Sequence, residues 1–188
     1  LLTYSISGQE YVLTLPSTVL TTLKVTPDQA NALAVSGAGT VVISSSDFTK
    51  GYADISGITT DSVLFPSDTI HIVNEGSRLY IGASQLATVL HIHDDTRAST
   101  LYLKGTVDKA FLAGLNAKID EVDTLSHLDL SLVAFSSDVA DLELLGLGRA
   151  YEVTVNLGSS HAVSVAQLVD TTDLHVYGTP SVDLLQGF

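Results

Sequence analysis

The chain has 188 residues, enough for one ordinary domain or two small ones, and a chain of this length buries a sizeable core. Eight basic residues against 21 acidic ones give a formal net charge of −13, which repels a phosphate backbone and excludes nucleic-acid binding. The hydrophobic fraction of 45% is too high for a disordered acidic tail, and the absence of cysteine excludes disulfides and thiolate chemistry.

The N-terminal residues and the polar composition of the chain indicate where the protein is found. The chain begins with Leu1 and opens on no charged n-region followed by an apolar h-region, so we expect a processed or excised piece of a longer protein. No uncharged run is apolar enough to predict a membrane span. Lysine is scarce while Ser, Thr and Val abound, a composition typical of β-structure and unusual for a cytosolic enzyme. We expect an extracellular or cell-surface location.

Short alternations of apolar and polar residues recur from one end of the chain to the other. Alternation with a period of two over four to six residues predicts half-buried strands. Turn signals, among them Ser36–Gly39 and Asn74–Ser77, separate these runs. The predicted strands are Val12–Leu15, Thr40–Ile43, Thr69–Val73, Thr100–Leu103, Leu128–Leu132 and Tyr151–Val155.

Three segments share one local pattern, in which a strand leads to a cap residue and a Gln follows three positions later. In two of them Thr26 precedes Gln29 and Ser164 precedes Gln167, while Gly82 before Gln85 is a weaker cap. A hydroxyl at the cap accepts from the third backbone N–H of a helical turn, and the Gln side chain accepts from the N–H of the cap residue. Each segment is therefore predicted to form a helical turn between two strands.

These patterns predict a mainly β chain with short helical turns. We interpret residues 1–188 as a single β-rich domain of degenerate repeats over about 23–58, 79–105, 128–155 and 161–185, forming a β-solenoid or a β-sandwich. A parallel solenoid is preferred over an antiparallel sandwich because tight Asn-Gly hairpins are missing. One longer helix is predicted near 106–119, with Thr106 as its cap and Phe111, Leu115 and Ile119 on one face.

The segment Leu23–Ile43, with Ala53–Ile58 after it, resembles repeats of large secreted bacterial surface proteins such as surface-layer proteins and long adhesins. The similarity covers about 36 residues well and returns in degraded form in the second and third copies. The resemblance implies a structural or adhesive extracellular protein that often depends on calcium. It transfers no catalytic motif, and the aspartate-rich glycine nonapeptides of calcium-binding toxin repeats are missing here.

Histidines predict one transition-metal site. His91 and His93 alternate on a strand and so project from one side, where they can chelate a metal together with a nearby carboxylate. His71 becomes a third ligand if its strand pairs alongside. The alternative interpretation is that His simply recurs at one strand position.

Clustered acidic residues predict calcium as the cofactor, because calcium takes six to eight oxygen ligands from carboxylates, carbonyls and water. The alternative is that these acids are solvated loop residues that confer solubility. The candidate calcium ligands are Asp94, Asp95, Asp120, Glu121 and Asp123.

Motifs for catalysis are weak, so we predict that the chain is not an enzyme. Its two glycine-rich pieces lead into strands, and no Gly-x-Ser-x-Gly elbow selects a nucleophile. The leading hypothesis is a self-assembling structural protein of a bacterial surface, as a layer, sheath or filament subunit or an adhesin segment, whose partners are copies of itself and surface polysaccharide. The alternatives are a carbohydrate-binding or polysaccharide-degrading β-helix protein and a virion or tail-fibre component.

Overall fold

The computed structural model describes residues 3–7, 10–15, 22–96, 98–119, 125–136, 150–157 and 173–178, and this part of the chain is mainly β. Within these described residues, two short 3₁₀ segments and two α-helices interrupt the strands. In chain order the elements are β1 (Thr3–Ser7), β2 (Glu10–Leu15), β3 (Thr22–Val25), α1 (Pro27–Ala30), β4 (Ala34–Ile43), β5 (Asp47–Phe48), β6 (Tyr52–Asp54), β7 (Ile58–Leu64), η1 (Pro66–Asp68), β8 (Thr69–Ile72), β9 (Arg78–Gly82), η2 (Ala83–Thr88), β10 (His91–Asp94), β11 (Thr100–Val107), α2 (Lys109–Lys118), β12 (Leu125–Phe135), β13 (Ala150–Leu157) and β14 (Asp173–Gly178).

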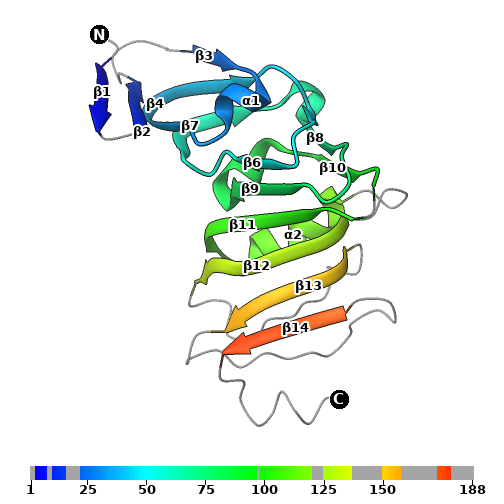
Figure 1. Ribbon diagram of the computed structural model, residues 1–188. Coiled ribbons are helices and arrows are strands. Elements are labelled where there is room, and N and C mark those ends of the chain that lie inside the picture. The colour runs from blue at the N-terminus through cyan, green and yellow to red at the C-terminus, as the bar shows by residue number, and fades with distance from the viewer. Residues whose placement is uncertain are drawn as a thin grey trace.

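The strands form three open sheets. One has the order β1-β2-β4-β3 with β7 also paired to β4, a second has the order β10-β8-β5, and the third has the order β14-β13-β12-β11-β9-β6. Figure 1 shows the strands of the third sheet stacked one after another from β6 to β14, with the N-terminal strands at the opposite end of the molecule. The described part of the chain is therefore an elongated stack of strands.

The strands of the six-stranded sheet are all parallel, and they pair in one register where they begin, although the pairing of β11 with β12 shifts between Tyr102 and Lys104. Tyr52 pairs with Arg78, Arg78 with Thr100, Thr100 with His127, and His127 with Glu152. A tight hairpin cannot join two parallel neighbours, so a longer crossover segment connects each strand of this sheet to the next.

Side chains alternate between the two faces of a strand. The residues that directly follow the paired residues named above therefore form a row on the opposite face of the sheet, and the residues two positions further along form a second row there. These rows are aliphatic and at most 5% exposed. Burying one such Leu, Ile or Val contributes about 1.5 to 3 kcal/mol, so the rows form the core of the stack. The first row is Ala53, Leu79, Leu101, Leu128 and Val153, and the second is Ile81, Leu103, Leu130 and Val155.

The structure departs from two expectations of chain path. Every described strand pairing except that of β1 with β2 is parallel, which contradicts the antiparallel sandwich, the less preferred of the two folds considered. Ser36–Gly39 forms no turn but lies inside β4, where the register with β7 shifts between Gly37 and Thr40. Gly37 has a φ of 104°, and a Cβ there would lie 2.2 Å from the Leu15 carbonyl oxygen, so glycine serves a bulge at this point.

The predicted strands and the first cap are confirmed. Each of the six predicted strand segments lies within a described strand except for Val73, which follows β8. Thr26 Oγ1 accepts from the Gln29 N–H at 3.2 Å, and Gln29 Oε1 accepts from the Thr26 N–H at 3.0 Å. The third copy, Ser164 with Gln167, lies outside the described residues.

Gln85 does more than the motif predicts. Its Oε1 accepts from the Gly82 N–H at 2.7 Å, as expected, but its Nε2 also donates to the carbonyls of Ile55 and Ile58 at 2.7 and 2.8 Å. The residue is 3% exposed. Gln85 therefore ties η2 to the segment that joins β6 to β7, some 30 residues earlier in the chain.

The longer helix is confirmed, but its start differs from the prediction. Thr106 lies within β11, and Asp108 accepts from the Phe111 N–H at 2.7 Å to cap α2. The strand continues through Thr106 because β11 keeps its parallel partner β12 as far as Val107. In the described part of the chain no helix combines the length and apolar character needed to cross a membrane.

We predict that Gln85→Ala lowers the free energy of unfolding by about 3 kcal/mol, because two buried carbonyls and one N–H lose their partner. Gln29→Ala is the matched control, since it removes the same motif residue at an exposed position and is expected to cost about 0.5 to 1 kcal/mol. Urea unfolding followed by circular dichroism measures both. Equal losses in the two variants would contradict the bridging role of Gln85.

Candidate functional site

The outward face of the six-stranded sheet carries rows of polar and aromatic side chains. Tyr80 and Tyr102 stack with ring centroids 4.2 Å apart, and Tyr52 lies against Tyr80 at 5.4 Å. Lys104 Nζ lies 4.9 Å from the centre of the Tyr80 ring and 2.7 Å from Asp54 Oδ2. Burial alone would raise the pKa of Asp54, but hydrogen bonds from Lys104 and Ser56 outweigh it and lower the pKa.

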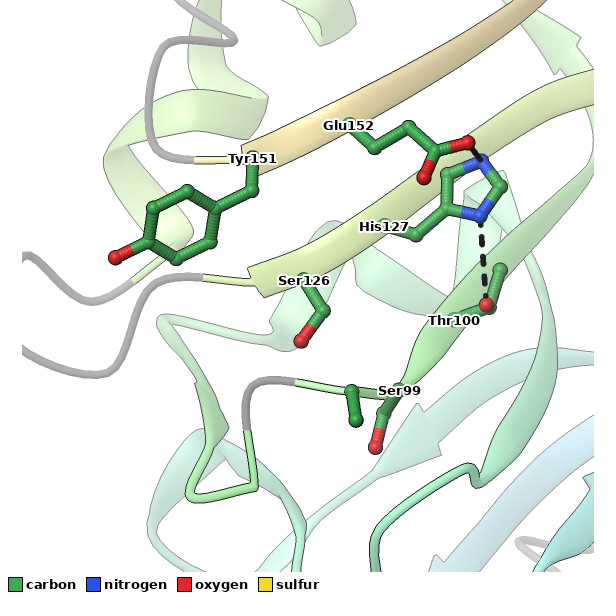
Figure 2. Close-up of a pocket in the computed structure, with 7 residues that line it drawn as sticks. Ser99, Thr100, Ser126, His127, Tyr151 and Glu152 are labelled. Atoms are coloured by element: carbon green, nitrogen blue, oxygen red, sulfur yellow. Dashed lines mark hydrogen bonds and ion pairs between the residues drawn. The ribbon is translucent and has the colours of Figure 1, made fainter. Parts of the chain in front are cut away.

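A pocket of about 580 Å³ opens beside these rows, where β11, β12 and β13 begin (Figure 2). Its lining includes three hydroxyls, an imidazole, a carboxylate and a tyrosine ring. The residues that line it are Ala98, Ser99, Thr100, Ser126, His127, Tyr151 and Glu152.

His127 is the centre of the polar lining. Its Nε2 lies 2.8 Å from Thr154 Oγ1 and 3.6 Å from Glu152 Oε1, and its Nδ1 lies 3.4 Å from Thr100 Oγ1. Glu152 Oε1 also lies 3.4 Å from Nε2 of His175 on β14. Residues on four successive strands thus hold the imidazole and the carboxylate in place, because parallel pairing sets their side chains next to one another.

Thr100, His127 and Glu152 supply a hydroxyl, an imidazole and a carboxylate, the groups of a hydrolase catalytic triad. Their geometry suits ligand binding better than catalysis. The hydroxyl contact of 3.4 Å is long, and Thr154 makes the shorter contact to the imidazole. Ser126, the other nearby hydroxyl, donates to Asp94 Oδ2 at 2.6 Å. The lining presents fixed donors and acceptors to whatever enters the pocket.

A second row of polar groups lies on the three-stranded sheet. His71 on β8 lies between two carboxylates, with Nδ1 3.0 Å from Asp47 and Nε2 2.7 Å from Asp95. Both ring nitrogens donate only in the protonated imidazole. Burial alone would lower the pKa of His71, but the hydrogen bonds and charges of Asp95 and Asp47 outweigh it and raise the pKa.

The structure brings together the three histidines of the predicted transition-metal site. Strand β10 pairs with β8 and sets His93 opposite His71, and the His93 ring lies 6.0 Å from the rings of both His71 and His91. The two nitrogens of His71 already contact carboxylates, which leaves this imidazole committed to Asp47 and Asp95. A transition metal at His91 and His93 stays a prediction.

The candidate calcium ligands divide into two groups. Asp94 is 1% exposed, and its carboxylate accepts from Thr96 and Ser126 through both their hydroxyls and their backbone N–H groups. Asp95 contacts His71, whereas Asp120, Glu121 and Asp123 lie outside the described residues. No group of three or more His, Cys, Asp or Glu residues suited to a metal occurs in the part of the chain that the structure describes. Calcium stays a prediction.

The sequence alone does not select the residues of the pocket. His127 directly precedes the predicted strand Leu128–Leu132, and Tyr151 and Glu152 lie in the predicted strand Tyr151–Val155. One signal is present, because Thr100, His127 and Glu152 each lie within one residue of the start of a predicted strand. Only the register of the strands turns that shared position into a shared site.

Comparison of the chain with protein-family models, with curated proteins and with solved structures finds no match.

We predict that Asp94→Asn lowers the free energy of unfolding by about 2 to 3 kcal/mol, because an amide nitrogen replaces an oxygen that accepts buried hydrogen bonds. Burial would raise the pKa of Asp94, but the hydrogen bonds of Ser126 and Thr96 outweigh it and lower the pKa. The contribution of Asp94 is therefore present above its ordinary pKa of 3.8 and is lost as the pH falls through the lowered value. Urea unfolding at pH 7 tests the loss, and exposed Asp61→Asn, expected within about 0.5 kcal/mol of the wild type, is the control.

We also predict that His71 stabilises the fold in a pH-dependent way. Because the pKa of His71 is raised in the folded state, its stabilisation is complete below the ordinary value of 6.5 and is lost as the pH rises through the folded pKa. The urea midpoints of the wild type and His71→Gln should differ more at pH 5.5 than at pH 8.5. His91→Gln on the neighbouring strand is the control, and a gap that is constant with pH for His71→Gln would refute the prediction.

Proposed function

We propose that this chain is a β-solenoid segment of an extracellular structural protein of a bacterial surface, which associates with copies of itself in a layer, sheath, filament or adhesin stalk. The observation that carries the proposal is the order in which the three sheets receive their strands. Strands β4, β5 and β6 enter the three sheets in turn, and β7, β8 and β9 follow in the same order. Then η2 lies beside β7, β10 pairs with β8, and β11 pairs with β9.

This rotation is what a coiled chain produces when each turn contributes one strand to each face. The sequence offsets between paired strands agree with it, since Val35 pairs with Ile58 in one sheet and Asp47 pairs with His71 in another, so both sheets gain a strand after a similar length of chain. In such a coil, each turn adds one residue to each aliphatic row and packs it against the row's residue from the turn before. A stack of this kind grows in length without a change in cross-section, which suits a stalk or filament.

The end of the stack supports self-association. Within the described residues, β14 is the last strand of the six-stranded sheet, and the ladder gives it one neighbour, β13. An edge strand carries backbone donors and acceptors that can pair with a second chain. Exposed Tyr177 on this strand adds an apolar surface of the kind found in contacts between chains.

The net charge of −13 sets the conditions for assembly. Copies of an acidic chain repel one another, and divalent cations reduce that repulsion by binding carboxylates. We propose calcium as the ion that favours assembly. The same stack would suit a virion or tail-fibre component, and the genomic neighbourhood separates these two settings.

We expect the purified chain at high concentration to form ordered filaments or sheets, more readily with calcium than with a chelator. Electron microscopy and sedimentation velocity provide the measurement. The double variant His175→Lys with Tyr177→Lys places charge on the β14 edge and should reduce assembly, because edge lysines oppose strand pairing. Leu132→Lys, at an exposed position on β12, which has a partner strand on each side, is the control. A wild-type chain that stays monomeric with and without calcium would refute the proposal.

A further inference from the structure

The pocket where β11, β12 and β13 begin has the features of a binding site for a small polar molecule. Its volume of about 580 Å³ lies within the range of small-molecule sites in proteins, roughly 300 to 1,000 Å³. The hydroxyls of Thr100 and Ser126 and the polar groups of His127 and Glu152 line it, above the buried Ser99 (Figure 2). A lining of this kind would leave its polar groups without partners around an apolar ligand, so it selects a ligand rich in hydrogen-bonding groups.

The polar groups are held in place before any ligand enters. His127 is fixed between Thr100, Thr154 and Glu152, and Glu152 lies between two imidazoles at 3.6 and 3.4 Å. Ser99 is fully buried beneath the pocket, where its hydroxyl donates to the Asn74 carbonyl at 3.2 Å and lies 2.9 Å from Thr96 Oγ1, so it supports the lining. Groups that neighbours already orient lose little entropy on binding, which favours affinity for a matching ligand.

Tyr151 supplies an apolar surface at the edge of the pocket. It is 45% exposed, although its position next to Glu152 on β13 would place it on the buried side by strict alternation. Figure 2 shows its ring beside the pocket, pointing away from the strands. An exposed tyrosine offers a ring face for stacking and a hydroxyl for hydrogen bonding.

The charge of the lining excludes two other ligand classes. The described lining contains the acidic Glu152 and no Lys or Arg, and the whole chain is acidic, so an anionic ligand is repelled. A metal ion would need three or more close ligands, and no such group occurs among the described residues. A neutral ligand with many hydroxyls and an apolar ring face remains.

We propose that this pocket binds one or two units of a neutral saccharide. The Tyr151 ring stacks on the apolar face of a sugar ring, and Glu152 accepts from sugar hydroxyls. The Thr100 hydroxyl donates and accepts, and Ser126 Oγ, whose hydrogen bonds Asp94, accepts. Saccharide binding in this pocket does not depend on the self-association proposed above. In a surface protein it would give the stalk a way to hold neighbouring polysaccharide.

The test is saturation-transfer NMR on the monomeric fraction with cellobiose, lactose, maltose, chitobiose and glucuronic acid as probes, followed by calorimetric titration of the strongest binder. We expect saturable binding of at least one neutral disaccharide and weaker binding of glucuronic acid. Tyr151→Ala should weaken the affinity at least tenfold, and Glu152→Gln several-fold. Tyr177→Ala, an exposed tyrosine on the adjacent strand outside the pocket, is the matched control and should leave the affinity unchanged.

Three results would overturn the proposal: no saturable binding of any neutral probe, tighter binding of glucuronic acid than of the neutral sugars, or equal losses in Tyr151→Ala and Tyr177→Ala. Circular dichroism of each variant checks that it is folded, as expected for substitutions of exposed side chains. Saccharide binding by a chain that never assembles would refute the proposed structural function alone, and assembly without binding would refute the pocket alone.

Discussion

The parallel, in-register pairing of strands is the constraint on which the rest of the structure depends. Once Leu79, Leu101 and Leu128 are aligned and buried, the residue before each of them must lie in a row on the opposite face. Shifting any strand by one residue would expose its aliphatic side chains and bury its polar ones. The hydrophobic rows inside therefore determine which polar side chains meet outside.

The same constraint explains why polar contacts here cross strands instead of following them. His71 lies between Asp47 and Asp95, and His127 lies between Thr100 and Thr154, each on three successive levels of a sheet. Spacings near 25 residues in sequence thus become contacts of about 3 Å. Gln85 forms a comparable long-range contact with the backbone, since its side-chain amide bonds Gly82 next to η2 and the carbonyls of Ile55 and Ile58, before and at the start of β7.

Prediction from the sequence succeeded where the signal was local. The alternations gave the strands, and the spacing of Thr26 and Gln29 gave a cap whose hydrogen bonds lie within three residues. It failed at Ser36–Gly39, where glycines that are typical of a turn instead serve a bulge because β4 pairs with β7 on both sides of them. The prediction that Thr106 caps the long helix was wrong for a similar reason, because pairing with β12 extends β11 through this residue.

The sequence by itself determined that the chain is β-rich, acidic and folded, because composition and alternation act within a few residues of each position. Only the tertiary structure decided which histidine meets which carboxylate and where a pocket opens. Those outcomes depend on the register between strands more than 20 residues apart, and the length of each connection controls that register. His91 and His127 are equally plain in the sequence, yet only His127 lies in the pocket, because its strand aligns it with Thr100 and Glu152.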